Sequence, residues 1–211
     1  MSATESRKLA IFFPGIGYTK DRPLLHYSRK MAKKYGYEEI CIEYHNLPFI
    51  VEKTEEEMLR AIEKAIPQVE EQLSKIDYSD VEEILLVGKS IGTALATKLC
   101  TDRHFNDIPV RIILYTPVEA TFRFLSADTA SCTGAASCTG AAAPAISFIG
   151  TGDPWSDLDC IIEEAKKLDI PLFTYADANH SLETPNVCEC VEILKHVMDV
   201  TEKFLLNNRS N

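Results

Sequence analysis

The feature that most constrains the fold of this chain is a regular alternation of short apolar runs with segments of helical periodicity. Apolar residues in the intervening segments recur at every third or fourth position, as on amphipathic helices. Six runs rich in Ile, Leu, Val and Phe are typical of buried strands: Lys8–Phe13, Glu38–Tyr44, Glu83–Val87, Val110–Tyr115, Ala145–Ile149 and Pro171–Tyr175. Strict alternation predicts a mostly parallel sheet with helices on both faces. We therefore expect an α/β protein, a three-layer α/β/α sandwich around a sheet of about six strands.

The expected helices carry recognisable signals at their ends. Asp21 can cap the first helix, and Thr54 precedes Glu57 by the spacing of a capping box. Pro67 is expected to kink or split the helix that follows Thr54. Ser156 can cap a later helix.

Length and composition limit the classes to which the protein can belong. The 211 residues suit one domain with its own core, so we expect a single domain over residues 1–211. A net charge of −10 argues against binding to nucleic acid or to an anionic membrane. We see no apolar run of membrane-spanning length and no signal-peptide pattern. The seven cysteines include no CxxC pair and suit free thiols in the cytosol, so we expect a cytoplasmic protein.

One segment departs from the alternation of strands and helices. Residues 130–135 read ASCTGA, and residues 136–141 repeat the same letters. Small polar residues bury too little surface to order a segment by themselves. We expect a flexible loop or a small lid segment within residues 119–144.

Glycine-rich turns follow several of the expected strands. In a parallel sheet the carboxyl ends of the strands meet at one edge, where ligands bind. Only nine glycines occur in the chain, and six of them lie in the turns Pro14–Tyr18, Gly88–Gly92 and Gly150–Asp153. The sequence therefore predicts a ligand site at this edge of the sheet. For Tyr18, ordinary packing in the core is the alternative. The substrate-binding candidates are Gly15, Gly17, Tyr18 and Lys89.

The segment Gly88–Gly92 reads GKSIG and fits the pattern G-x-S-x-G between a strand and a helix. That is the setting of a nucleophile elbow, a sharp turn that presents the Ser90 hydroxyl above the sheet. A P-loop also ends in Gly-Lys-Ser, but it needs a glycine where this chain has Glu83. A helix-starting serine among packing glycines is the structural alternative.

A serine nucleophile needs a base and a group that orients the base. His180 follows the sixth expected strand, in a loop downstream of Ser90. Asp153 follows the fifth expected strand, so it can lie beside His180. Glu119, just past the fourth strand, stays open as the acid. A surface histidine and a helix-entry carboxylate are the structural alternatives.

With these residues the chain resembles the α/β-hydrolase superfamily, in particular its small single-domain bacterial members without a large cap. The resemblance implies Ser90 as nucleophile, Asp153 as acid and His180 as base, which is the family's chain order. It spans most of the chain and rests on four segments: Phe12–Gly17, Leu86–Gly92, Gly150–Pro154 and Ala178–Ser181.

The resemblance also implies that the backbone N–H groups of Ile16 and Ile91 form an oxyanion hole. Pro14 departs from the family, which usually has a histidine before the first glycine. No large cap domain fits between Tyr115 and Ala145, so the implied site is open. No His or Cys spacing of a zinc site occurs, and we expect neither a metal nor a cofactor.

The sequence favours a serine hydrolase that cleaves a small ester or thioester through an acyl-enzyme intermediate. Two other functions stay open: a noncatalytic small-molecule binding protein with the same fold, and an acyltransferase that uses the same serine. The expected partner is a small-molecule acyl substrate, with no nucleic acid and no membrane. The sequence does not give the oligomeric state.

Overall fold

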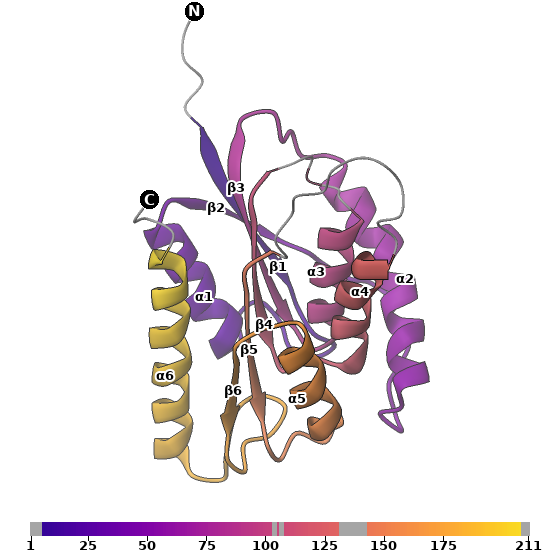
Figure 1. Cartoon of the computed structure of the whole chain (residues 1–211), viewed down its shortest axis with the longest axis vertical. Coiled ribbons are helices and arrows are strands. Elements are labelled where there is room, and N and C mark those ends of the chain that lie inside the picture. The colour runs from indigo at the N-terminus through magenta and orange to yellow at the C-terminus, as the bar shows by residue number, and fades with distance from the viewer. Residues whose placement is uncertain (1–5, 103–104, 106–107, 131–142, 208–211) are drawn as a thin grey trace, which may run out of the picture.

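A parallel β-sheet forms the centre of the molecule (Figure 1). The computed structural model describes residues 6–102, 105, 108–130 and 143–207, and of residues 126–130 it describes the backbone only. Within these residues the sheet has six strands in the order β2-β1-β3-β4-β5-β6, and each neighbouring pair is parallel. The strands are β1 (Arg7–Phe13), β2 (Tyr37–Cys41), β3 (Val81–Lys89), β4 (Val110–Tyr115), β5 (Ala145–Gly150) and β6 (Leu172–Tyr175).

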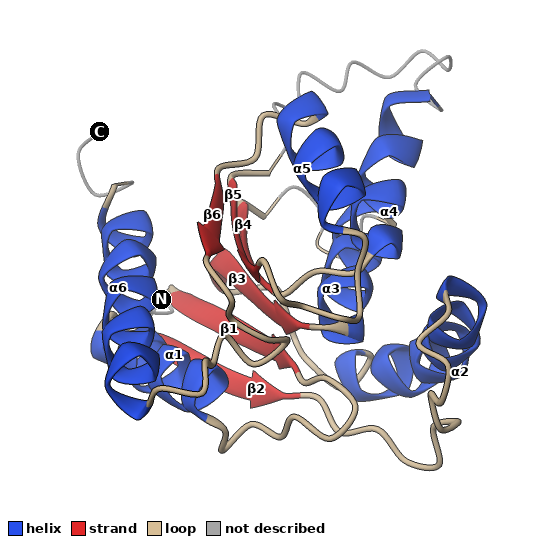
Figure 2. Ribbon diagram, turned by 90° about the horizontal axis from the view of Figure 1, so that it is seen from below, coloured by secondary structure: helices blue, strands red, loops and turns tan. Residues whose placement is uncertain are grey.

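Helices cover both faces of the sheet, as Figure 2 shows. Two of them, α1 (Pro23–Lys34) and α6 (Val187–Leu206), lie on one face. The opposite face carries α2 (Glu55–Leu73), α3 (Ile91–Thr101), α4 (Glu119–Ala130) and α5 (Leu158–Lys167). The predicted three-layer α/β sandwich is therefore confirmed.

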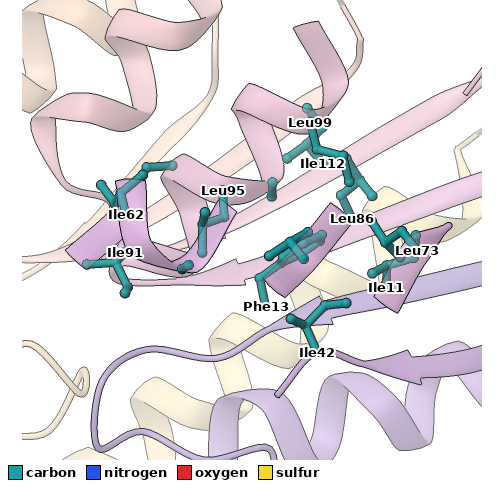
Figure 3. Close-up of a cluster of buried hydrophobic side chains, with 14 of the residues drawn as sticks. Ile11, Phe13, Ile42, Ile62, Leu73, Leu86, Ile91, Leu95, Leu99 and Ile112 are labelled. Carbon is teal, nitrogen blue, oxygen red and sulfur yellow. The ribbon is translucent and has the colours of Figure 1, made fainter. Parts of the chain in front are cut away.

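The core consists of two main layers of side chains, one on each side of the sheet. Successive strand residues point to opposite faces, so Ile11 and Phe13 join the cluster under α2 and α3 in Figure 3. Ala10 and Phe12 join the cluster under α1 and α6. Because both faces are covered, the inner parts of the central strands, such as Leu9–Phe13 of β1 and Ile84–Val87 of β3, are apolar and buried.

The expected strands are all present, with differences at their ends. The fourth has the expected bounds, whereas β2 ends at Cys41 rather than Tyr44. The third is longer at both ends, because Lys89 still pairs with Tyr115 of β4. As a result β3 leads directly into Ser90.

Two of the expected helix caps are wrong. Asp21 does not cap α1, because Arg22 occupies the N-cap position and the Tyr18 hydroxyl accepts from the Leu24 N–H at 3.1 Å. Ser156 does not cap α5, because its hydroxyl donates to the carbonyl of Pro117 at 2.7 Å. The Asp157 carboxylate caps α5 instead.

Helix α2 runs without a break through Pro67, so the prediction that it is split is wrong. Its apolar face, from Met58 to Leu73, is buried against the sheet, and this packing outweighs the lost backbone hydrogen bond. The expected cap is confirmed, since the Thr54 hydroxyl accepts from the Glu57 N–H at 3.3 Å.

The segment predicted as a flexible loop or small lid begins as a helix. Residues 119–130 form α4, and Phe122 on it is fully buried. Most of the repeated segment falls in residues 131–142, outside the described residues, so that expectation stays a prediction. Within the described parts of the chain, no helix is long and apolar enough to cross a membrane.

Candidate active site

The predicted site residues lie where β3, β5 and β6 end, at the lower edge of the sheet in Figure 1. Ser90 directly follows β3, Asp153 follows β5 by three residues, and His180 follows β6 by five. The strand order places β4 between β3 and β5, and β6 beside β5. The fold therefore gathers residues that are distant in the sequence at one edge.

Ser90 occupies a strained turn between a strand and a helix. Its φ of 57° and ψ of −128° are unfavourable for a residue with a side chain. Backbone hydrogen bonds hold it there: its N–H donates to Tyr115 O at 3.0 Å, and its carbonyl accepts from Thr93 N at 2.8 Å. This is the geometry of a nucleophile elbow.

The first turn of α3 presses against the end of β1. A Cβ built on Gly92 would lie 2.0 Å from the carbonyl oxygen of Phe13, so only glycine fits there. This contact brings the elbow close to the loop that follows β1. The N–H groups of Ile16, in that loop, and Ile91, at the start of α3, donate to no other described residue.

Asp153 and His180 form a buried hydrogen-bonded pair. The Nδ1–H of His180 donates to Asp153 Oδ2 at 2.7 Å, and the other carboxylate oxygen accepts from Trp155 N at 2.9 Å. The Asp153 side chain is 1% exposed and that of His180 is 16% exposed. Because Nδ1 carries the proton, Nε2 of the neutral ring carries the lone pair.

Two loops hold this pair together. A Cβ on Gly150 would lie 2.0 Å from the carbonyl oxygen of Ala178, so the loops after β5 and β6 touch backbone to backbone. The Gly152 N–H donates to the same oxygen at 3.0 Å, and the Asp177 N–H donates to Thr151 Oγ1 at 2.8 Å. These contacts bring the Asp153 carboxylate to the imidazole.

The remaining nitrogen of His180, Nε2, is buried and has no hydrogen-bond partner among the described residues. The structure therefore joins the acid to the histidine but forms no hydrogen bond between the histidine and Ser90. A buried acceptor without a partner is unfavourable, so Nε2 is free to accept a hydrogen bond from a ligand.

Burial is the largest cause that lowers the pKa of His180, to about 4. The charges of Lys89 and Lys53 lower this pKa further, while the hydrogen bond and charge of Asp153 raise it. His180 is therefore neutral at pH 7 and can act as a base.

Other predicted residues lie elsewhere. The Glu119 carboxylate accepts from the Asp157 N–H at 2.6 Å, and its only hydrogen bond among the described residues is this one. Tyr18 is buried, and its hydroxyl accepts from the Leu24 N–H at 3.1 Å. Lys89 is only 1% exposed. Gly15 is buried and Gly17 is exposed, and the role of these four residues in substrate binding stays a prediction.

An open cleft of about 390 Å³ lies next to Trp155, and Ser90, Asp153 and His180 are not among its lining residues. The Trp155 ring, which borders it, packs on the His180 ring with centroids 5.5 Å apart, and the Lys53 ammonium lies 5.1 Å from the Trp155 ring centroid. Sequence reasoning missed both residues, although the only tryptophan of the chain stands two residues after Asp153. The cleft is lined by Lys53, Glu55, Glu119, Pro154, Trp155, Ser156, Asp157 and Cys160.

Within the described residues, no group of three or more His, Cys, Asp or Glu side chains could hold a metal ion.

Comparison with known proteins identifies the fold. No family model and no curated protein sequence matches the chain. Est1E from Butyrivibrio proteoclasticus has a similar structure, with a TM-score of 0.65, 12% identity, and coverage of 100% of this chain and 91% of that one. The structure of Est1E with ferulic acid bound has a TM-score of 0.63 and 14% identity, and the match covers 99% of this chain and 92% of that one. XC6422 from Xanthomonas campestris is described as an α/β serine hydrolase without a lid. Its TM-score is 0.52 with 10% identity, and the match covers 97% of this chain and 85% of that one.

At these identities the likeness shows the fold alone. The resemblance noted in the sequence is thus confirmed at the level of the fold. The chain has a minimal α/β-hydrolase fold with an all-parallel sheet of six strands in its described part.

Proposed function

We propose that the protein is a serine hydrolase that cleaves a small ester or thioester through an acyl-enzyme intermediate. One observation carries the proposal: His180 Nδ1 is held by Asp153 at 2.7 Å while its buried Nε2 has no described partner. The strained Ser90 turn at the same sheet edge supports it. Together these residues supply the nucleophile, base and orienting acid of acyl transfer.

In the proposed reaction, His180 Nε2 takes the proton of Ser90 Oγ as this oxygen attacks the substrate carbonyl. Asp153 keeps the proton on Nδ1 and stabilises the imidazolium that forms. The N–H groups of Ile16 and Ile91 donate to the oxyanion. His180 then returns the proton to the leaving group, and water repeats the sequence to release the acid.

The open cleft is the proposed binding site for one part of the substrate. Its volume of about 390 Å³ suits a small molecule. Its lining carries three carboxylates, those of Glu55, Glu119 and Asp157, against the one ammonium of Lys53. This excess of negative charge disfavours anionic substrates. Est1E binds ferulic acid, so a hydroxycinnamoyl ester belongs among the substrates tested.

Chromogenic acyl esters of increasing chain length, with one thioester and one hydroxycinnamoyl ester, test the proposal. We expect the wild type to hydrolyse at least one short ester and Ser90→Ala to lose about 10⁴-fold or more in kcat. Ser74→Ala is the control, because its hydroxyl caps the end of α2 and donates to Glu71 O. Equal rates for the wild type and Ser90→Ala would contradict the proposal.

Two alternatives are distinguished by the same system. Added alcohol or thiol acceptors that capture the acyl group in preference to water would indicate an acyltransferase. Specific binding of an ester without any turnover would indicate a noncatalytic binding protein, and the missing Ser90–His180 hydrogen bond is the observation that keeps this alternative under test.

A further inference from the structure

Lys89, next to the proposed nucleophile, is a buried cation that the proposed reaction does not use. Its side chain is 1% exposed, and no described residue forms a hydrogen bond or an ion pair with its ammonium. Burying a cation without such partners is costly. Lys89 is the last residue of β3, and its burial there requires an explanation.

The contacts of Lys89 lie under the loop that follows β1. Its Nζ lies 5.0 Å from the centroid of the Tyr18 ring. A Cβ built on Gly15 would lie 3.6 Å from Lys89 Cγ and 3.0 Å from Ser90 Cβ. The side chain therefore lies close to both ends of the turn from Gly15 to Tyr18.

This turn carries the proposed oxyanion donor. Gly15 and Tyr18 form an isolated β-bridge, and the Tyr18 N–H donates to Gly15 O at 3.2 Å. Ile16 lies between them. The Tyr18 hydroxyl accepts from the Leu24 N–H at the start of α1, so the ring is fixed on its far side too.

We infer that Lys89 is a positioning residue, whose ammonium holds the Tyr18 ring and thereby the Ile16 N–H in register with Ser90. The inference rests on the proposed function. A cation over an aromatic face is most stabilising where water is excluded, as it is here. Lys89 does not touch the substrate in this role, and it acts through Tyr18.

The charge of Lys89 also reaches the histidine. Burial lowers the pKa of Lys89 to about 7, against the opposing charge of Asp153. Lys89 in turn lowers the pKa of His180, together with Lys53 from the loop after β2. The charged groups that act on the Tyr18 hydroxyl are Glu183 and Arg22.

Lys89→Met tests the inference, because it keeps the length of the stem and removes the charge. Because the pKa of Lys89 is lowered to about 7, the rates are compared at about pH 6, where its ammonium is charged. Since loss of a whole oxyanion donor lowers kcat about 10²–10³-fold, we expect displacement of one to lower kcat about tenfold there, with a smaller change in KM. The acid limb of the kcat/KM profile should move to higher pH, because the charge that lowers the pKa of His180 is gone. A purely structural role for the stem would leave this limb in place.

Lys8→Met is the matched control. Lys8 lies at the start of β1, where its ammonium pairs with Glu83 at 2.9 Å. Removing this cation changes the total charge by the same amount as Lys89→Met. It should leave kcat and the pH profile at their wild-type values.

A second pair of variants tests the role of the ring independently, including the case in which Lys89→Met does not fold. Tyr18→Leu removes the aromatic face and should lower kcat as Lys89→Met does. Tyr18→Phe keeps the face and loses only the hydroxyl, so it should retain most of the rate. In the double variant that combines Tyr18→Leu with Lys89→Met, the two losses in kcat should not add, because each substitution removes the same contact between the ammonium and the ring.

Two results would overturn the inference: a folded Lys89→Met protein with wild-type kcat and an unmoved acid limb, or equal rates for Tyr18→Leu and Tyr18→Phe. Failure of the proposed function would look different, since the wild type itself would then neither hydrolyse the esters nor react with a fluorophosphonate at Ser90.

Discussion

At the scale of single residues, Asp153 does most to orient the candidate base. Its two carboxylate oxygens accept from His180 Nδ1 and from the Trp155 N–H. The Trp155 ring packs on the same imidazole. One carboxylate thus links the histidine to the loop that supports it.

Asp153→Asn should lower kcat for ester hydrolysis about 10⁴-fold, because an amide can donate to Nδ1 and stabilise the wrong tautomer. Asp159→Asn is the control, as Asp159 is exposed on the next helix. Steady-state kinetics on both purified variants measure the effect. A loss of less than tenfold in folded Asp153→Asn would mean that this carboxylate is not the acid.

The pH profile reports the state of His180. Since the pKa of His180 is lowered to about 4, the imidazole stays neutral well below pH 6.5. Activity is lost only as the pH falls towards about 4, where the imidazole is protonated. We expect kcat/KM to be flat from neutral pH down to about pH 5. An acid limb with its midpoint at or above the ordinary histidine value of about 6.5 would contradict this account.

How far the sequence predicts the site depends on the residue. The chain order of Ser90, Asp153 and His180 at strand ends predicts that they meet at one sheet edge, and two of them are hydrogen-bonded there. The burial of Lys89 and Tyr18 could not be predicted, because it depends on how the loop after β1 folds over the end of β3.

At the scale of elements, the contact between the loops after β5 and β6 determines whether acid and base meet. Gly150→Ala places a methyl group 2.0 Å from Ala178 O, whereas Gly152→Ala meets nothing closer than 3.2 Å. We expect Gly150→Ala to lower the free energy of unfolding by about 1–3 kcal/mol. It should also lower kcat, because the loops must separate.

Gly152→Ala serves as the matched control and should have a much smaller effect on both quantities. Urea denaturation and ester hydrolysis of the two variants measure the difference. Equal stability and activity for both would show that the loop contact is not needed for the site.

Helix ends were harder to predict than helices. The cap at Thr54 follows from local spacing, so the sequence predicts it. At Ser156 a tertiary contact with Pro117 O competes with the cap, and at Pro67 packing against the sheet keeps the helix whole. Sequence patterns report local preferences, and these residues are governed by tertiary contacts.

At the scale of the whole molecule, the alternation of strands and helices determines the fold almost alone. Both faces of β1 are buried. Ile11 and Phe13 point into the core on one side of the sheet, and Ala10 and Phe12 point into the core on the other. The apolar runs therefore predict strands even without alternating polarity. Residues 131–142, with most of the repeated segment, are the part about which this pattern says nothing.

Stability should rise with pH from acid to mildly alkaline conditions. Between about pH 4 and 6.5 the unfolded chain binds a proton at His180 that the folded chain does not bind. Between about pH 7 and 10.5 the unfolded chain likewise binds a proton at Lys89 that the folded chain has lost. Each group adds at most about 1.4 kcal/mol per pH unit in its range. Urea midpoints at about pH 5, 7 and 9 should therefore increase in that order. A midpoint that is highest at pH 5 would contradict the burial of both groups.

The most direct test of the central claim is to map the site of reaction with a fluorophosphonate by peptide mass spectrometry. The account predicts one probe per chain, bound to Ser90, with no adduct in Ser90→Ala and a greatly slowed reaction in His180→Ala. A folded wild-type protein that carries no adduct at Ser90 would contradict it.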